Sequence, residues 1–281
     1  IGRLADSVGA SRSPVETLLK RKILRIALKP APKTTFDDAV VAKTAPLTLN
    51  EEQKAAFSAI VESVRAPEFK TFLLHGVTGS GKTEIYLQAI ARVVQSGRQA
   101  IVLVPEISLT PQTAKRFRER FERVGVMHSG LTDRERTAIW ERCRRGEIDV
   151  VIGPRSALFA PLTRPGLIII DEEHDSSFKQ QNNPRYHARD TAVMRAKLSN
   201  IPIVLGSATP GLESYHNALT GKYTLLTLAK RVLDRPLPKV AVRDMGEEMK
   251  LQNRFVVLSS VLDRLLREAL EELLPIKHVD A

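Results

Sequence analysis

Residues 76–83, GVTGSGKT, place glycines, a lysine and a threonine in the spacing G-x-x-x-x-G-K-[ST]. In such a loop, backbone N–H groups face a phosphate, and the helix that follows adds the positive end of its dipole. The lysine reaches the β- and γ-phosphates of a nucleotide, and the threonine hydroxyl can ligate Mg²⁺. The alternative is a glycine-rich turn that binds nothing. The residues expected to hold the nucleotide are Gly76, Thr78, Gly79, Ser80, Gly81, Lys82 and Thr83.

A second stretch, LIIIDEEHDSSF at 167–178, runs from apolar residues into three acids and a histidine. Alone, it could be a strand that meets a solvated loop. In a protein with a phosphate loop, however, the end of another strand must bring a carboxylate to the Mg²⁺. We therefore expect Asp171 to act on the metal shell and Glu172 to orient and deprotonate the attacking water.

Short apolar runs alternate with amphipathic segments and would position both stretches. Strands are predicted at 71–75, 100–104, 124–128, 149–153, 167–171 and 201–206, with a further candidate within 221–231. Helices are predicted at 51–64, 84–97, 110–124, 132–146, 189–200 and 259–274. Near-continuous apolar strands, each followed by a helix, indicate an α/β fold with a parallel sheet covered by helices on both faces.

Composition narrows the function classes. The chain has 281 residues, 43% of them hydrophobic, and a net charge of +11. This charge is typical of a protein with a polyanionic partner such as nucleic acid, and a soluble protein with a basic surface is the alternative. No apolar run approaches the ~18 residues that a membrane helix needs. A single cysteine, Cys143, excludes an internal disulfide and a cysteine-rich zinc site, and we expect it to pack in the core.

The N-terminal residues differ in character from the rest of the chain. Residues 1–28 read as helix, turn and helix, similar to the end of a winged-helix or helix-turn-helix module; an ordinary helical hairpin is the alternative. Residues 29–46 are rich in proline and read as a linker, 47–235 as the nucleotide-binding domain, and 236–281 as a connection and helix. Without an initiator methionine, the chain is expected to be a piece of a longer protein.

Further motifs carry a resemblance. DEEH at 171–174 resembles the DExH form of the helicase Walker B motif. VPEISLTPQT at 104–113, VIGPRSALF at 151–159 and GSATP at 206–210 resemble helicase motifs Ia, Ib and III. With the segment 171–190, these motifs resemble the PriA family, the bacterial replication-restart helicases of superfamily 2. The resemblance implies a RecA-like first helicase lobe from about residue 47 onward.

The resemblance also implies residue roles. Gln53 would read the adenine; Lys82, Glu172 and His174 would be catalytic, with His174 linked to the motif III residues Ser207 and Thr209. The loop at 174–190 resembles an aromatic-rich loop that senses single-stranded DNA, although its composition alone favours a solvated connector. The residues expected to contact DNA are Arg155, Phe178, Lys179, Arg185, Tyr186 and Arg189. A solvated helix face is expected instead for Arg116, Arg118, Arg120 and Arg123.

For the whole protein, the resemblance implies an ATP- and Mg²⁺-dependent 3′–5′ helicase of the bacterial cytoplasm, associated with the nucleoid and not with a membrane. Its partners would be single-stranded and forked DNA, primosome proteins and single-strand-binding proteins. The family's second lobe, with its arginine finger, and its zinc-binding cysteines are not in this sequence, so we expect ATP binding with little hydrolysis. Two alternatives stay open: a lobe of another superfamily 2 DNA translocase, or a non-catalytic DNA-binding module.

Overall fold

The protein is described from a computed structural model that covers residues 17, 21, 42–66, 68–231, 242–252 and 257–273. The chain divides into two compact units, Ile1–Asp234 and Arg235–Ala281, which are treated separately. The helix-turn-helix expected within residues 1–28 and most of the expected linker lie outside the described residues. The account below therefore concerns mainly the larger unit from residue 42 onward.

A seven-stranded sheet in the order β3-β4-β2-β5-β8-β1-β9 forms the centre of the larger unit, and every neighbouring pair is parallel. The predicted α/β fold class is therefore confirmed, and the candidate strand within 221–231 is the edge strand β9. The strands are β1 (Thr71–Gly76), β2 (Gln99–Leu103), β3 (Val124–Val126), β4 (Val150–Gly153), β5 (Pro165–Asp171), β8 (Ile203–Ser207) and β9 (Thr224–Leu228).

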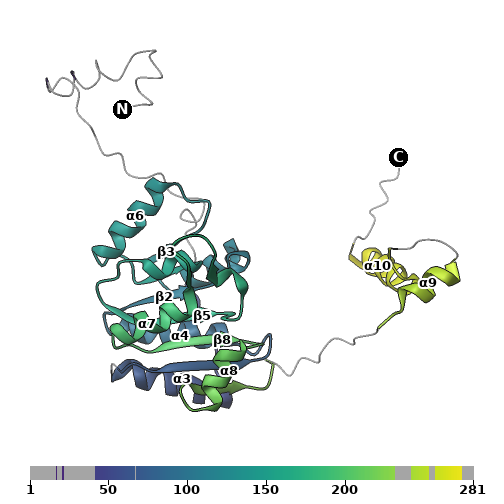
Figure 1. The fold of residues 1–281 in the computed structure, drawn as a ribbon, viewed down its shortest axis with the longest axis horizontal. Helices are drawn as coiled ribbons and strands as arrows, with labels where there is room; N and C mark the ends of the chain where they lie inside the picture. The colour runs from purple at the N-terminus through teal and green to yellow at the C-terminus, as the bar shows by residue number, and fades with distance from the viewer. Residues whose placement is uncertain are drawn as a thin grey trace. The chain divides into compact units, whose positions relative to one another are not determined.

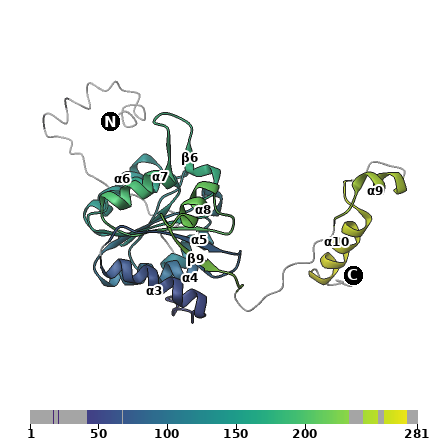
Figure 2. The ribbon, with the colours of Figure 1, turned by 60° about the horizontal axis from the view of Figure 1, so that its bottom comes forward.

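Helices cover both faces of this sheet, which explains why its central strands are apolar on both sides. Figure 2 shows α3 and α4 on one side of the sheet and α6 and α7 on the other. Separate buried clusters fill the two faces: one contains side chains of α3, α4 and α5, the other side chains of α6, α7 and α8. The helices are α3 (Glu51–Arg65), α4 (Lys82–Gln95), α5 (Pro111–Arg118), α6 (Asp133–Arg144), α7 (Ala188–Leu198) and α8 (Leu212–Leu219).

Parallel register brings the ends of distant segments together at one edge of the sheet (Figure 1). In the pairing of β1 with β8, His75 lies opposite Ser207, and in the pairing of β5 with β8, Asp171 lies opposite Gly206. The phosphate loop follows β1, the acidic stretch follows β5, and GSATP spans the end of β8. Three motifs that are far apart in sequence therefore meet at the carboxyl edge, where α/β proteins bind ligands.

Some of the connections that follow the strands contain regular structure where only loops were predicted. The described residues include three 3₁₀ turns: η1 (Glu106–Ser108), η2 (Arg155–Phe159) and η3 (Ser176–Phe178). The segment expected to be an aromatic-rich loop contains a two-stranded antiparallel hairpin of β6 (Lys179–Gln180) and β7 (Tyr186–His187). The hairpin ends directly at α7, so its orientation is fixed at that side by the core packing of the helix.

The end of the expected linker packs against the domain. The backbone N–H of Thr44 donates to the carbonyl of Glu119 at 3.0 Å, and the Lys43 ammonium donates to the carbonyl of Arg118 at 3.0 Å. The backbone N–H of Leu47 donates to Glu84 at 3.0 Å. Residues 43–47 are thus attached to α4 and to the end of α5, which the proline-rich composition did not indicate.

The smaller unit contains α9 (Met245–Gln252) and α10 (Ser260–Leu273). The amphipathic helix predicted at 259–274 is confirmed as α10, whereas α9 was not predicted. The backbone N–H of Ser260 donates to Glu248 at 2.9 Å, which joins the start of α10 to the middle of α9. Across the described residues of both units, no helix combines the length and the apolar character that a membrane crossing requires.

Cys143 allows a direct test of this fold. Its side chain is buried between α6 and the sheet, and burial raises the pKa of its thiol to about 11. Because the thiolate is the reactive form, we predict that a disulfide reagent labels the folded protein at pH 8 at least ~100-fold more slowly than the protein in urea. Labelling at equal rates in both states would contradict the placement of this residue.

Candidate nucleotide-binding site

The phosphate loop connects β1 to α4 through two residues with left-handed backbone conformation. Gly79 has φ 81° and Gly81, the N-cap of α4, has φ 86°. Residues other than glycine rarely adopt this backbone conformation, so glycine is required for the loop to turn around the end of the helix. The first turn of α4 then begins at Lys82 and Thr83, which places both residues at the positive end of the helix dipole.

The phosphate loop buries two polar side chains, Lys82 and Ser80. The residue Lys82 is 8% exposed, and its ammonium donates to the carbonyl of Gly76 at 2.8 Å. The hydroxyl of Ser80 is buried and has no hydrogen-bond partner among the described residues. An inward-turned lysine and an unsatisfied buried hydroxyl within one glycine-rich loop fit the phosphates of a nucleotide.

Asp171 stands at the end of β5 next to a tyrosine that the sequence did not point to. The hydroxyl of Tyr86, on α4, donates to Oδ1 of Asp171 at 3.1 Å. Burial and, secondarily, the neighbouring charge of Glu172 raise the pKa of Asp171 to about 6. A Cβ at Gly206 would lie 1.6 Å from this hydroxyl, so a glycine in GSATP is what lets Tyr86 reach the carboxylate.

Glu172 and His174 connect the acidic stretch to motif III. Glu172 has φ 48°, a left-handed conformation that non-glycine residues adopt at a cost and that is concentrated at functional sites. Nδ1 of His174 lies 2.8 Å from the hydroxyl of Ser207, and Nε2 lies 3.3 Å from that of Thr209. The structure therefore brings together the three residues that were expected to couple.

Glu173, between these two residues, was missed by the sequence analysis. Its carboxylate is fully buried and accepts hydrogen bonds from the backbone N–H of Gly211 at 2.7 Å and the hydroxyl of Ser214 at 2.8 Å. Arg189 lies 3.4 Å from it and also contacts Asp190 and Glu213. The guanidinium of Arg189, 11% exposed as a side chain, is thus held among carboxylates, and its expected contact with DNA phosphate is not supported.

Gln53 occupies a position different from the one expected. Its side-chain oxygen accepts from the backbone N–H of Asn50 in the capping box of α3, and its side-chain nitrogen donates to the carbonyl of Ser80 at 2.8 Å. The residue is only 4% exposed. Both ends of its amide are therefore engaged, and the structure shows Gln53 supporting the phosphate loop from behind rather than facing a base.

A cavity of about 630 Å³ is lined by six of the expected nucleotide residues, Thr78 to Thr83, whereas Gly76 and Gln53 are not among its lining residues. Its wall includes residues 78–83 of the phosphate loop together with Asp171 and Glu172, so the groups expected to bind phosphate and metal face one space. The described residues contain no cluster of three acidic, histidine or cysteine side chains for a metal. Mg²⁺ is usually bound through one or two protein ligands together with phosphate oxygens and water, and the expected ligands Thr83 and Asp171 both line this cavity.

The hairpin forms a second, separate cavity. A space of about 600 Å³ is lined by Lys179, Arg185, Tyr186 and their neighbours in β6, β7 and the connection between them. Tyr186 also packs edge-to-face on Phe159 of η2, with ring centroids 5.3 Å apart, and Phe159 remains 45% exposed. The expected DNA contacts Lys179, Arg185 and Tyr186 thus lie together on one projecting element, which is labelled β6 in Figure 2.

Phe178 does not belong to this surface. Its ring is fully buried in the core cluster beneath the hairpin, so it has no face on which a base can stack, and the expectation that it does so is wrong. Phe178 instead packs into the core at the end of the turn η3. Arg155 donates to the carbonyl of Ser177 at 2.7 Å and lines a third cavity of about 400 Å³ beside Tyr186.

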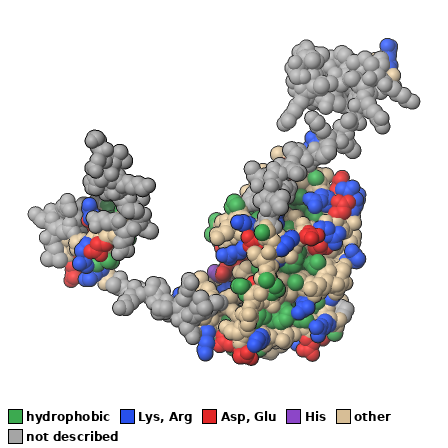
Figure 3. All heavy atoms as spheres, turned by 180° about the vertical axis from the view of Figure 1, so that it is seen from behind, with side chains coloured by type: hydrophobic (Ala, Val, Ile, Leu, Met, Phe, Trp, Pro, Cys, Tyr) green, Lys and Arg blue, Asp and Glu red, His purple; other side chains and the backbone are tan. Residues whose placement is uncertain are grey.

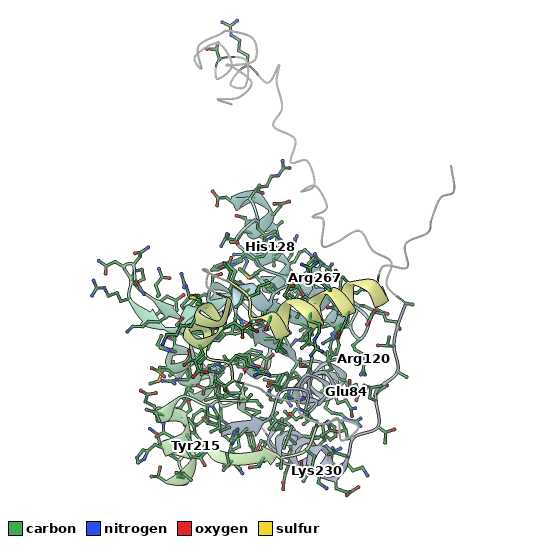
Figure 4. All side chains as sticks on the ribbon, turned by 90° about the vertical axis from the view of Figure 1, so that its right-hand side faces the viewer. Glu84, Arg120, His128, Tyr215, Lys230 and Arg267 are labelled. Carbon is green, nitrogen blue, oxygen red and sulfur yellow. The ribbon has the colours of Figure 1, made fainter. Side chains whose placement is uncertain are left out.

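The arginines of residues 116–123 do not form one solvated face. Arg120 pairs with Glu84 of α4, next to which it lies in Figure 4. The two side chains are 10% and 11% exposed. Arg123 pairs with Asp149 in a more exposed contact. On the face seen in Figure 3, lysine and arginine side chains are spread among acidic and apolar ones, so the net charge of +11 is not gathered there into one patch.

The raised pKa of Asp171 predicts how stability depends on pH. In the unfolded chain this carboxyl titrates near 3.9, so between about pH 4 and 6 the folded state binds more protons, and the free energy of unfolding falls as pH rises. We predict that Asp171→Asn, measured by calorimetry without Mg²⁺, raises the Tm at pH 7.5 by about 2–4 °C, as ~1 kcal/mol does in a domain of this size.

The gain should shrink at pH 4, where Asp171 is protonated in the folded state and about half protonated in the unfolded chain, so that little linkage remains. Glu141→Gln, which removes an exposed carboxylate from α6, is the matched control and should leave the Tm unchanged. A lower Tm for Asp171→Asn at pH 7.5, or a difference that does not vary with pH, would contradict the assigned environment.

Comparison with known proteins finds similarity to helicases. The family of the "DEAD/DEAH box helicase" matches residues 50–218. "Replication restart protein PriA" of Bacillus subtilis (strain 168) is 48% identical over 263 residues, 93% of this chain and 33% of the relative. The protein of the same name from Haemophilus influenzae is 49% identical over 227 residues, 80% of this chain and 30% of the relative. The chain thus spans about a third of these curated relatives.

A solved structure shares the fold as well. RecG bound to a three-way DNA junction superposes with a TM-score of 0.52 and 28% identity over 68% of this chain and 25% of RecG. The resemblance to replication-restart helicases is confirmed at the level of sequence similarity. Because the family match covers more than half of the sequence, the chain belongs to the DEAD/DEAH box helicase family.

Proposed function

We propose that this chain is the ATP-binding lobe of a DNA helicase that acts in bacterial replication restart. The observation that carries the proposal is the convergence of the phosphate loop, Asp171 and Glu172 on one cavity of about 630 Å³. The similarity to replication-restart proteins over 93% of the chain supports the process in which the parent protein works.

In this proposal the chain's own residues bind and orient the reactants. The phosphate loop and Lys82 hold the β- and γ-phosphates, which requires the ammonium to leave the carbonyl of Gly76. Thr83 and Asp171 hold the Mg²⁺, which when bound neutralises developing charge on the phosphates. Glu172 orients the attacking water and accepts its proton, and the left-handed backbone at this residue fixes where the carboxylate points.

A chain of contacts supports coupling between hydrolysis and DNA. His174 lies 3.7 Å from Glu172 and contacts Ser207 and Thr209 of motif III, and the buried Glu173 joins α8 to the start of α7, where the hairpin ends. We propose that Lys179, Arg185 and Tyr186 contact single-stranded DNA, with Arg155 beside them, through charge on phosphates and stacking on a base.

For the parent protein, we propose 3′–5′ translocation, action on forked DNA, and assembly with primosome and single-strand-binding proteins in the bacterial cytoplasm, at the nucleoid. Its zinc-binding cysteines would lie in sequence other than these 281 residues, which contain one cysteine. An arginine finger supplied by a second lobe is commonly worth ~10³–10⁵ in rate, so these 281 residues on their own should bind ATP and hydrolyse it poorly.

The test is titration of a fluorescent ATP analogue with Mg²⁺. We predict saturable binding that Lys82→Ala weakens by at least ~10-fold, because a charge-assisted phosphate contact contributes more than about 1.4 kcal/mol. Lys222→Ala removes an equally positive but exposed side chain after α8 and should have no effect.

Steady-state hydrolysis is measured on the same samples, with and without single-stranded DNA. A turnover near the 1–10³ s⁻¹ of typical enzymes would contradict the requirement for a second lobe. Equal binding by the two lysine variants would contradict the assignment of the phosphate site.

A further inference from the structure

Tyr86 is a large side chain that the fold buries completely beside the nucleotide site. It is 1% exposed and belongs to α4, three positions after Thr83 and four after Lys82. Residues at these spacings lie on one side of a helix, so the ring extends from the side of α4 that carries the two phosphate and metal contacts. No motif in the sequence pointed to this tyrosine.

The hydroxyl of Tyr86 is directed at the carboxylate that is expected to act on Mg²⁺. It donates to Oδ1 of Asp171 at 3.1 Å. Near neutral pH a phenol is protonated and an ionised carboxylate can only accept, so the direction of this hydrogen bond is fixed. Asp171 lines the cavity of about 630 Å³, whereas Tyr86 is not among its lining residues. The tyrosine therefore supports the carboxylate from within the protein and does not itself face the nucleotide.

Gly206 leaves the space in which this contact forms. It lies opposite Asp171 in the pairing of β5 with β8, and its carbonyl accepts from the backbone N–H of Glu173 at 3.0 Å. A Cβ at Gly206 would lie 1.6 Å from the Tyr86 hydroxyl and 3.5 Å from Oδ1 of Asp171. Gly206 is not among the glycines with positive φ, so the glycine is required here for space and not for backbone conformation.

The partner of the buried phenol indicates more than a role in folding. A buried hydroxyl must find a hydrogen-bond partner, but any acceptor would satisfy it. Here the acceptor is the side chain of a residue expected at the metal, and its backbone is already fixed by the register of β5 with β8. A hydrogen bond to one carboxylate oxygen restricts the remaining rotation of the side chain, as partners of metal-binding side chains usually do.

We propose that Tyr86 is a positioning residue for Mg²⁺: its hydroxyl holds Oδ1 of Asp171, so that the carboxylate is oriented toward the metal before the nucleotide binds. This inference rests on the proposed function, because it assumes that the phosphate loop binds a nucleotide together with Mg²⁺. Tyr86 acts through Asp171 and contacts neither phosphate nor metal. Gly206 of motif III belongs to the same arrangement, because it leaves the space that the hydroxyl occupies.

Two conditions separate the metal from the nucleotide. The affinity for a fluorescent ATP analogue is measured for each protein with saturating Mg²⁺ and again in EDTA, and the ratio of the two affinities reports how strongly the protein engages the metal. Tyr86→Phe removes only the hydroxyl. Tyr223→Phe removes the hydroxyl of another buried tyrosine, in the core cluster on the opposite face of the sheet, and is the matched control. Thermal unfolding of each variant shows that the protein measured is folded.

We expect Tyr86→Phe to lower this ratio about 10-fold, as loss of the partner of a metal-binding side chain commonly does, and to leave the affinity in EDTA within about twofold of the wild type. In the Asp171→Asn background the same change should have no further effect on the ratio, because Tyr86 acts through that carboxylate. A role in folding alone would not produce this dependence. Tyr223→Phe should change neither affinity.

Gly206→Ala tests the same contact without removing the tyrosine. Its added methyl group displaces the Tyr86 hydroxyl, so we expect a similar fall in the ratio. An unchanged ratio in Tyr86→Phe, an equal loss with Mg²⁺ and in EDTA, or a further loss in the Asp171→Asn background would overturn the proposal. Failure of the proposed function would look different: Lys82→Ala would then bind the analogue as well as the wild type does.

Discussion

The parallel register of β5, β8 and β1 is the constraint on which the site depends. Asp171 is opposite Gly206 and His75 is opposite Ser207, so the ends of three strands arrive at one edge within a single layer of the sheet. A shift of one residue in either pairing would turn side chains of a strand to the other face. The register is fixed by strands that are buried on both faces, which makes the hydrophobic core the element that aligns the phosphate loop with its carboxylate.

Close approach then tunes the chemistry of that edge. Gly206 leaves space for the Tyr86 hydroxyl, which reaches Asp171 from the helix that follows the phosphate loop. Glu173 ties α8 and Arg189 to the acidic stretch in the same way, through a carboxylate fully removed from solvent. Neighbouring acids in DEEH therefore have opposite surroundings: Glu172 faces the cavity, while Glu173 is an internal junction between elements.

Much of this could be predicted where the signal is local in sequence. The phosphate loop depends on the backbone freedom of glycine, and the strand before Asp171 depends on a run of apolar residues. Both features could therefore be predicted from the sequence alone. The sequence did not place Gln53, Phe178, Arg189 and Arg120 correctly, because their environments are set by partners 16 to 36 positions away or by burial under other elements. A polar or aromatic residue in a functional motif does not reveal whether it faces a ligand or the core.

The most direct test of the account is a crystal structure of this chain with Mg²⁺ and a non-hydrolysable ATP analogue. The account predicts that the Lys82 ammonium leaves the carbonyl of Gly76 to contact the terminal phosphate, that Thr83 and Asp171 lie at the Mg²⁺, and that β5, β8 and β1 keep their register. A nucleotide bound elsewhere, with the contact between Lys82 and Gly76 intact, would contradict the claim that these strand ends form the ATP site.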